Sequence, residues 1–291
     1  MTAGLNMWSD ISSISNTIRE DATFVIREAA NILPHVLSLS DMKGSNLRAN
    51  FGYNSNSAGT IGEATDLTST TFAATAMQTL TPKEIGSQYF VTDQRADSQS
   101  PDRIFTDAAR DLGLQAVTKI ESDLYDCFAD LTGGSAGGTG TSGTPTWGFL
   151  AAAIAQARNA NKSPNVPLVA IVHGYVWAVL AKSASVAGSS LAQAPGYTEE
   201  ITRNGYVASF MGVPIFTFYQ TITGGASTAV KNAVFPREAI AIDWRRPVRV
   251  EGERNASLRG TEFNMSAVYA AGVWRPELGV YFNALAATPT S

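Results

Sequence analysis

Few residues in this sequence belong to the types that most often carry out chemistry in proteins. There are two histidines, His35 and His173, and one cysteine, Cys127. His35 follows an expected helix and His173 follows an expected buried strand, so we interpret both as structural residues rather than general bases. Cys127 has no basic neighbour that would lower its pKa, so we expect a half-buried, unreactive thiol. One cysteine also excludes an internal disulfide and a cysteine-based zinc site. The sequence predicts no catalytic, cofactor-binding or metal-binding residues.

One glycine pattern matches a nucleotide-binding motif in form only. Gly138, Gly140 and Gly143 fit the spacing G-x-G-x-x-G. That motif binds a dinucleotide where a strand precedes the glycines and a helix follows them directly. Here a long expected helix precedes the glycines and Pro145 follows them. We therefore interpret this segment as a flexible linker.

Acidic residues cluster at Asp123, Asp126 and Asp130. They lie on one expected helix, and the sequence identifies no partner group for Asp123 or Asp126. We expect these carboxylates to form a solvated helix face.

A basic run at Trp244–Arg249 is bracketed by Asp243, Glu251 and Glu253. This bracketing favours ion pairs along a strand over phosphate binding. Exposed pairs of this kind contribute little singly, but across a subunit contact they can fix register and the choice of partner.

The composition excludes several classes of protein. Of 291 residues, 16% are charged and 44% are hydrophobic, whereas an average domain carries about 25% charged residues. This balance excludes a charge-rich disordered chain. An excess of 25 Asp and Glu over 21 Lys and Arg argues against a dedicated nucleic-acid binder. The N-terminus lacks a signal-peptide pattern, and the apolar stretch at 166–181 is short for a membrane span, so we expect a soluble protein made in a cytoplasm.

The N-terminal segment predicts a helix that ends at Pro34. Ile11, Ile14, Ile18 and further apolar residues up to Ile32 recur at steps of three and four, which places them on one helical face. No compact segment follows that could cover this face. We expect it to dock on a distant element or on another subunit.

Two β-like runs follow, at Thr68–Leu80 and Glu84–Thr92, on either side of Thr81-Pro82-Lys83. Proline at the second position of a turn fits a β-hairpin. Neither run has a continuous apolar face, and a two-stranded ribbon is marginally stable alone. We therefore expect a long hairpin that needs a partner surface.

The strongest helix signal covers Pro101–Leu131, where apolar residues keep one helical stripe throughout. Such a helix would be about 45 Å long, which is unusual for a globular domain. Beyond the linker, helices and strands alternate, and the last hundred residues are β-rich. The expected elements are helices at 147–159 and 175–182, two strands at 206–218 bent at Met211-Gly212, and strands at 168–172, 239–243, 248–253, 262–269 and 279–283.

Several local sequences resemble those of a known family. ATFVIREAANILPHV (Ala22–Val36) resembles its N-terminal arm, and LTPKEIGSQYFVTDQ (Leu80–Gln94) resembles a strand of its extended loop. IESDLYDCFADLTGG (Ile120–Gly134) resembles the end of its spine helix. The most specific stretches are GYVASFMGVPIF (Gly205–Phe216) and AVFPREAIAIDWRRPVRVE (Ala233–Glu251). The family is the tailed-bacteriophage major capsid protein with the Hong Kong 97-like fold, and the resemblance covers nearly the whole chain.

The resemblance implies an α+β chain with the Hong Kong 97-like capsid fold. Loops at 187–202 and 220–231 would then lie at the centre of a capsomer. The implied segments are the N-terminal arm (1–39), the extended β-hairpin loop (40–99), the peripheral-domain spine helix and linker (100–145), the axial α/β domain (146–238) and the peripheral β-strands and return (239–291).

The resemblance also implies a structural function rather than an enzyme. Members assemble as hexamers and pentamers into an icosahedral shell around double-stranded DNA, with arm and loop lying across neighbouring subunits. The implied partners are copies of the chain itself, a portal, an optional decoration protein and packaged DNA bound non-specifically, with no cofactor and no membrane. Because the chain begins close to the arm, we also expect a separate scaffolding protein or earlier processing. The implied location is the virion capsid, assembled in the cytoplasm of a bacterial host.

Some family members crosslink a lysine of the extended loop to an asparagine of a neighbour. Lys83 lies in a suitable region, but no partner asparagine can be matched, so noncovalent locking is expected. Residues 67–82, 131–157, 205–230 and 282–291 contain no charge, which is typical of surfaces covered by other subunits. The expected interface residues are Ile11, Ile14, Ile18, Lys83, Glu84, Arg245, Arg246, Arg249, Glu251, Glu253 and Arg254.

Two alternatives stay open on the sequence alone. An encapsulin-type nanocompartment protein shares this fold but holds cargo enzymes rather than DNA. An enzyme with an unrecognised α/β site would need a pocket with convergent polar groups and shifted pKa values.

Overall fold

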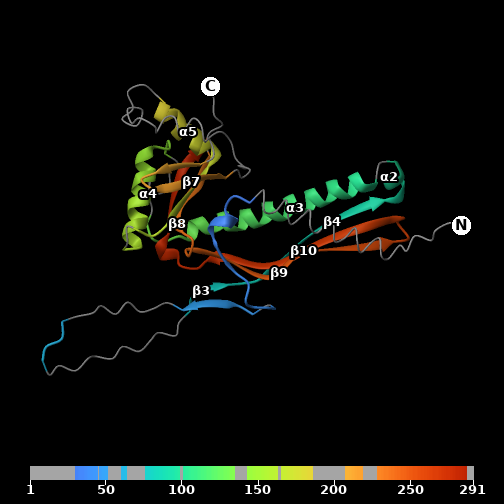
Figure 1. Cartoon of the computed structure of the whole chain (residues 1–291), viewed down its shortest axis with the longest axis horizontal. Coiled ribbons are helices and arrows are strands. Elements are labelled where there is room, and N and C mark those ends of the chain that lie inside the picture. The colour runs from blue at the N-terminus through green and yellow to red at the C-terminus, as the bar shows by residue number, and fades with distance from the viewer. Residues whose placement is uncertain are drawn as a thin grey trace.

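The computed structural model describes residues 30–44, 46–51, 60–63, 76–98, 101–134, 143–162, 165–185, 207–218 and 228–286. These residues form a four-stranded sheet, a five-stranded sheet and a two-stranded sheet, with helices packed on the two larger sheets. Figure 1 shows the long helix α3 (Pro101–Asp126) running beside β4 (Lys83–Thr92), β9 (Ile240–Asn255) and β10 (Gly260–Val273), which extends the molecule away from its α/β part.

The predicted long helix is confirmed as α3, which continues as a 3-10 turn, η2 (Cys127–Asp130). Its 26 residues span about 39 Å at the usual rise per residue. The apolar stripe is buried, with Leu112, Ile120 and Leu124 all inaccessible to solvent. This long buried face provides the support along which the four-stranded sheet extends.

The four-stranded sheet has the order β1-β9-β10-β4, with β1 at Leu37–Leu39. β10 alternates as predicted, because Phe263, Met265, Ala267 and Tyr269 are buried while the residues between them are half-buried. The two strands expected at 239–243 and 248–253 form the single strand β9. β1 joins β9 in parallel, so the end of the segment expected as the arm (1–39) is built into this sheet.

The register between β9 and β10 is interrupted around Arg245. Val268 pairs with Arg246 and Tyr269 pairs with Trp244, so Arg245 is an extra residue on β9. A second shift lies between Ser266 and Val268. Bulges of this kind bend a strand and re-aim a side chain. They allow the 16-residue strand β9 to curve from the α/β part into the extension.

The five-stranded sheet has the order β11-β8-β5-β7-β6. The side chains of β5 alternate between two cores, since Ala170 and Val172 pack with α4 and α5 whereas Ile171 packs with Phe128 of η2. The sheet is therefore covered on both faces. Its elements are α4 (Trp147–Ala160), β5 (Leu168–His173), α5 (Gly174–Ser185), β6 (Val207–Phe210), β7 (Val213–Phe218), β8 (Thr228–Pro236) and β11 (Val280–Ala286).

Most predicted elements of this part are confirmed within one to three residues at each end. The bend at Met211-Gly212 is a tight turn with φ of 53° and 76°, as a two-residue hairpin turn requires. The prediction of a loop at 220–231 is wrong at its C-terminal end, because Thr228–Lys231 begins the strand β8. β8 lies between β5 and β11, and both neighbours supply hydrogen bonds that its sequence alone does not reveal.

The predicted hairpin between 68–80 and 84–92 is wrong. β3 (Ala76–Leu80) pairs with β2 (Arg48–Phe51), whereas β4 pairs along its whole length with β10. The physical reason is burial: Val91 of β4 reaches the core under α3, and Leu80 of β3 packs in a separate cluster with Ala241 and Ala270. Thr81-Pro82 therefore links two sheets, and the true hairpin is β2–β3.

The residues Ile11, Ile14 and Ile18 of the predicted N-terminal helix lie outside the described residues. The described chain starts at Ala30 and passes into a 3-10 turn, η1 (Leu33–His35), in which Pro34 takes an early position. Ile32 is completely buried in the cluster around Phe128. The junction between arm and body is therefore part of the core. β2 and a short helix, α2 (Asp93–Ser98), were not expected from the sequence.

Candidate subunit interface and its charged clusters

Charged residues of β9 form ion pairs, but only some of these pairs run along the strand as predicted. Arg246 pairs with Glu84 of β4, and Arg249 pairs with Glu251 on its own strand. All four side chains are at least 40% exposed, so each pair contributes little to stability by itself. Their role at a subunit contact stays a prediction.

Arg254 and Asp93 make the best aligned of the exposed pairs. Both terminal nitrogens of Arg254, Nη1 and Nη2, donate to the Asp93 carboxylate, and the Nη2 bond is 2.7 Å long. These hydrogen bonds lower the pKa of Asp93. Glu253, the neighbouring interface candidate, is exposed and stands opposite Glu262 of β10. Two carboxylates in register repel each other, and the side-chain amides of Gln88 and Asn255 both donate to Glu262.

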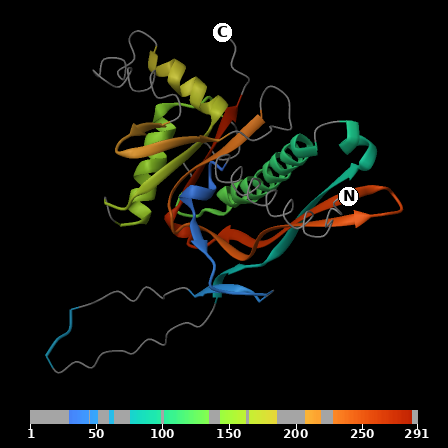
Figure 2. The same cartoon turned by 45° about the vertical axis from the view of Figure 1, so that its right-hand side comes forward.

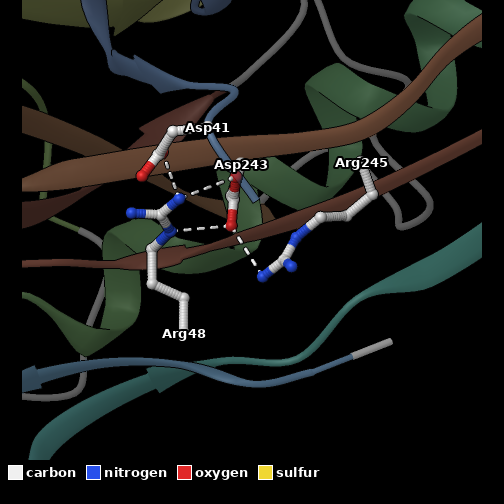
Figure 3. A network of polar contacts seen from close by, with 4 residues as sticks. All are labelled: Asp41, Arg48, Asp243 and Arg245. Atoms are coloured by element: carbon white, nitrogen blue, oxygen red, sulfur yellow. Dashed lines mark hydrogen bonds and ion pairs between the residues drawn. The ribbon is translucent and has the colours of Figure 1, made fainter. Parts of the chain in front are cut away.

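A second cluster lies at the base of the β2–β3 hairpin and includes Arg245 (Figure 3). Arg48 of β2 donates from Nε to Asp243 Oδ2 at 2.8 Å and also pairs with Asp41. Arg245 Nη2 lies 2.8 Å from the same Asp243 oxygen. The Asp243 side chain is fully buried and that of Arg245 is 1% exposed. The guanidinium of Arg245 is thus enclosed by its own chain.

Lys83 is held by Asp123, which corrects the expectation that Asp123 belongs to a solvated face. Lys83 Nζ lies 2.7 Å from Asp123 Oδ2, Lys119 Nζ lies 3.0 Å from Oδ1, and the Tyr269 hydroxyl donates to the same carboxylate. Burial alone would raise the pKa of Asp123, but these hydrogen bonds hold it below its usual value. Three partners, two of them distant in sequence, explain why no local pattern revealed this site. Asp126 and Asp130 are exposed, as expected.

The remaining residues of catalytic type have structural partners. The backbone N–H of His173 donates to Asn232 at 2.8 Å, and the ring Nδ1 accepts from the Tyr175 N–H at the start of α5. The ring of His35 lies 4.0 Å from that of Phe216. Cys127 is buried, and desolvation together with nearby carboxylates raises the pKa of its thiol to about 12. These contacts agree with the structural interpretation of all three residues.

Glu121 of α3 holds the backbone near the start of the described residues, and no local sequence pattern reveals this contact. Its carboxylate accepts the backbone N–H groups of Ile32 at 2.8 Å and Leu33 at 3.0 Å. It therefore caps η1, whose own N-cap residue, Ile32, has no side-chain acceptor. Burial raises the pKa of Glu121 despite these hydrogen bonds. Glu121 therefore holds the backbone at Ile32 and Leu33 against α3, close to the start of the described residues.

Replacing Glu121 with alanine is expected to free these two amides while the cores stay intact. Amide hydrogen exchange at Ile32 and Leu33 should accelerate about tenfold or more, since a hydrogen bond to a charged acceptor is lost at each. Exchange at Leu124, one turn along the same helix, serves as the internal control and should not change. Glu121→Gln keeps one acceptor oxygen, so its exchange rates at Ile32 and Leu33 should fall between those of the wild type and those of Glu121→Ala. Equal exchange at Ile32 in the wild type and in Glu121→Ala would show that the carboxylate does not hold this junction.

Exposed apolar side chains lie at the extremities of the described structure. Ile61, between β2 and β3 in sequence, is 58% exposed, and Leu258, in the β9–β10 turn, is 59% exposed. Met211 in the β6–β7 turn and Leu114 on α3 are also exposed. Exposed apolar residues that occur singly are common on protein surfaces, so they do not by themselves mark a contact surface.

A cavity lies between β4 and α3. It is lined by Tyr89, Phe90, Val91, Arg95 and nearby residues of α3. The Tyr89 hydroxyl donates to Asp111, and this bond raises the pKa of Tyr89. Within the described ranges, no group of three potential metal ligands occurs and no helix is long and apolar enough to span a membrane.

The chain is similar to known proteins in both sequence and fold. The sequence model of one family, described as phage capsid protein, matches residues 57–281. The chain belongs to this family. The match covers β3, β4, the spine helix and the strands β5 to β10, and so includes every described interface candidate. The protein is therefore a capsid shell protein, and its place is the virion capsid. No curated protein matches the capsid protein in sequence.

Solved capsid structures share its fold. A structure of Mycobacterium phage Che8 has a TM-score of 0.61 and 18% identity and covers 82% of this chain and 85% of its own. The capsid of cyanophage P-SCSP1u has a TM-score of 0.62 and 14% identity over 88% of both chains. The SrpI encapsulin of Synechococcus elongatus PCC 7942 has a TM-score of 0.57 and 9% identity over 89% of both chains. The predicted Hong Kong 97-like fold is confirmed, and the encapsulin likeness shows that fold alone does not identify the contents of the shell.

Proposed function

We propose that this capsid protein is the major capsid protein of a tailed bacteriophage, which assembles as hexamers and pentamers into an icosahedral shell around double-stranded DNA. The observation that carries the proposal is the phage-capsid match over residues 57–281, joined to a fold shared with phage capsids. The same proposal includes assembly in the host cytoplasm, a separate scaffolding protein, a portal and no enzymatic role.

The charge of the chain suits this role. With a net charge of −4, the wall would attract DNA weakly, and a strongly basic inner surface would bind phosphates and hinder packaging. The described parts of the charge-free segments lie largely in the chain's own cores, as Ile154 and Ile215 do, whereas Ile61 and Leu258 are exposed and would contact neighbouring subunits. The interface residues expected on β4 and β9 would then set register through charge at the rims of these contacts.

An encapsulin-type shell is the second candidate, and the likeness to the SrpI encapsulin favours keeping it. The two candidates differ in what the shell encloses. Particles purified from the native source and treated with nuclease should retain double-stranded DNA if the shell belongs to a phage. Particles that retain a protein cargo and no DNA would support the encapsulin and overturn the phage proposal. Image classification of the same particles should show both six-fold and five-fold capsomers.

Removal of the arm tests its proposed part in assembly. The deletion should end at residue 29, because Ile32 belongs to the core and its loss would confuse folding with assembly. The chain that starts at Ala30 should keep the unfolding transition of the intact protein but form far fewer shells in electron micrographs. Normal shell yield from the shortened chain would contradict a role for the arm.

A further inference from the structure

The β2–β3 hairpin forms a two-stranded sheet of its own and is tied to the body at a few described points. Figures 1 and 2 both show it below the four-stranded sheet. Arg48 reaches Asp243, the side-chain amide of Asn50 donates to the carbonyl of Trp274, and Leu80 packs on Ala241. Of these ties, the ion pair of Arg48 is the one that involves a fully buried charge.

Asp243 is shared between two arginines. Its Oδ2 atom lies 2.8 Å from Arg48 Nε and 2.8 Å from Arg245 Nη2 (Figure 3). Arg48 comes from the hairpin, whereas Arg245 comes from the same strand as Asp243. The Nη2 atom of Arg48 also contacts Asp41, which is exposed and can be solvated without a partner. The two carboxylates that bind Arg48 therefore differ. Water can solvate Asp41 if Arg48 leaves, whereas the buried Asp243 then needs another positively charged partner.

Arg245 is only partly satisfied in this arrangement. Its side chain is 1% exposed, yet its Nε and both Nη atoms make no well-aligned hydrogen bond. The short contact to Asp243 is an ion pair of poor hydrogen-bond geometry. A guanidinium has a planar fork that matches both oxygens of a carboxylate. The bulge at Arg245 frees this residue from the regular β9–β10 ladder, so its side chain can turn without breaking the strand pairing.

We propose that Arg48 and Arg245 are alternative partners of Asp243, and that Arg245 takes both carboxylate oxygens when the hairpin moves away. Removal of the only partner of a buried carboxylate is strongly destabilising, because an uncompensated charge remains. A second arginine on the same strand avoids this penalty. The hairpin can then change its angle to the body while the four-stranded sheet stays intact, which goes beyond a static role in the shell.

A double-mutant cycle on the unassembled full-length chain tests this exchange, so its result does not depend on the nature of the shell. Arg48→Met alone should shift the unfolding equilibrium constant by no more than about tenfold, because Arg245 takes over. In the Arg245→Met background the same change should shift it more than about a hundredfold, because Asp243 loses every partner. Arg246→Met, next on the strand but paired with Glu84, is the matched control and should show no coupling to Arg48. Equal effects of Arg48→Met in the two arginine backgrounds would overturn the proposal.

A structure of the Arg48→Met protein gives a direct second readout that needs no double variant. Arg245 should be turned so that two of its nitrogens donate to the two oxygens of Asp243. A guanidinium that keeps its present single contact, with water in the place of Arg48, would overturn the exchange even if the stability data showed coupling.

Discussion

Replacement of Phe128 with alanine is expected to lower the free energy of unfolding by about 4 kcal/mol. Phe128 is completely buried where η2 meets the five-stranded sheet. Its ring centroid lies 5.6 Å from that of Tyr125, 5.7 Å from Phe235 and 6.2 Å from Phe218. Loss of the ring removes apolar burial and leaves a cavity that its rigid neighbours cannot fill. Chemical denaturation followed by tryptophan fluorescence measures the change.

Leu114→Ala is the control for this prediction. Leu114 lies on the same helical segment but is 49% exposed, so its truncation should change stability by less than about 0.5 kcal/mol. Phe128→Leu keeps most of the volume and should cost about 1.5 kcal/mol, which keeps the prediction measurable if the alanine variant does not fold. Similar losses of stability for Phe128→Ala and Leu114→Ala would show that the packing of η2 does not hold the spine helix against the α/β part.

Asp123→Ala is expected to cost about 3 kcal/mol, because the buried hydroxyl of Tyr269 and the ammonium of Lys83 lose their shared acceptor. Tyr269→Phe in the same background should then cost less than it does in the wild type, since the hydroxyl no longer has this partner. Asp126→Ala, an exposed carboxylate three residues further along, is the control and should change stability by less than about 0.5 kcal/mol. Strictly additive effects at Asp123 and Tyr269 would contradict the shared site.

The pH dependence of stability should carry the signature of Asp123. The pKa of Asp123 is lowered in the folded chain, so its contribution is present above its unfolded pKa of about 3.9 and is lost as pH falls through the lower folded value. Below about pH 4, the wild type should therefore lose more stability than Asp123→Asn. Glu121, whose pKa is raised by burial, acts in the opposite sense, since its contribution is lost as pH rises through its folded pKa. Parallel pH profiles for the wild type and Asp123→Asn would contradict the lowered pKa.

The sequence predicts those parts of the fold that have a local cause. The apolar stripe of 101–131, the turn at Met211-Gly212 and the alternation of 262–269 each follow from spacing or backbone preference within a short window. The ion pair between Arg249 and Glu251 is of the same kind, since the two residues lie two positions apart on one strand. These features needed no knowledge of distant contacts.

The features that escaped prediction depend on partners far away in the chain. Two residues separate β3 from β4, but β4 pairs with β10 and β3 pairs with β2. The turn indicated by Pro82 is compatible both with a β3–β4 hairpin and with a link between two sheets. Asp123 lies on a helix whose exposed neighbour Asp126 has the same local pattern, and only contact with Lys83 and Tyr269 distinguishes them. The partners of Glu121 are backbone N–H groups, which every residue except proline carries, so the sequence gives no sign of this contact.

Sedimentation velocity of the purified full-length chain, over a range of concentrations and with its scaffolding protein if one is needed, tests the central claim most directly. Each subunit has a mass of 30.8 kDa, so a closed shell sediments far ahead of any small oligomer. The shell proposal predicts a fast, narrow boundary that contains most of the protein, with capsomers as the only abundant slower species. A single boundary at the mass of one subunit under every condition would contradict it.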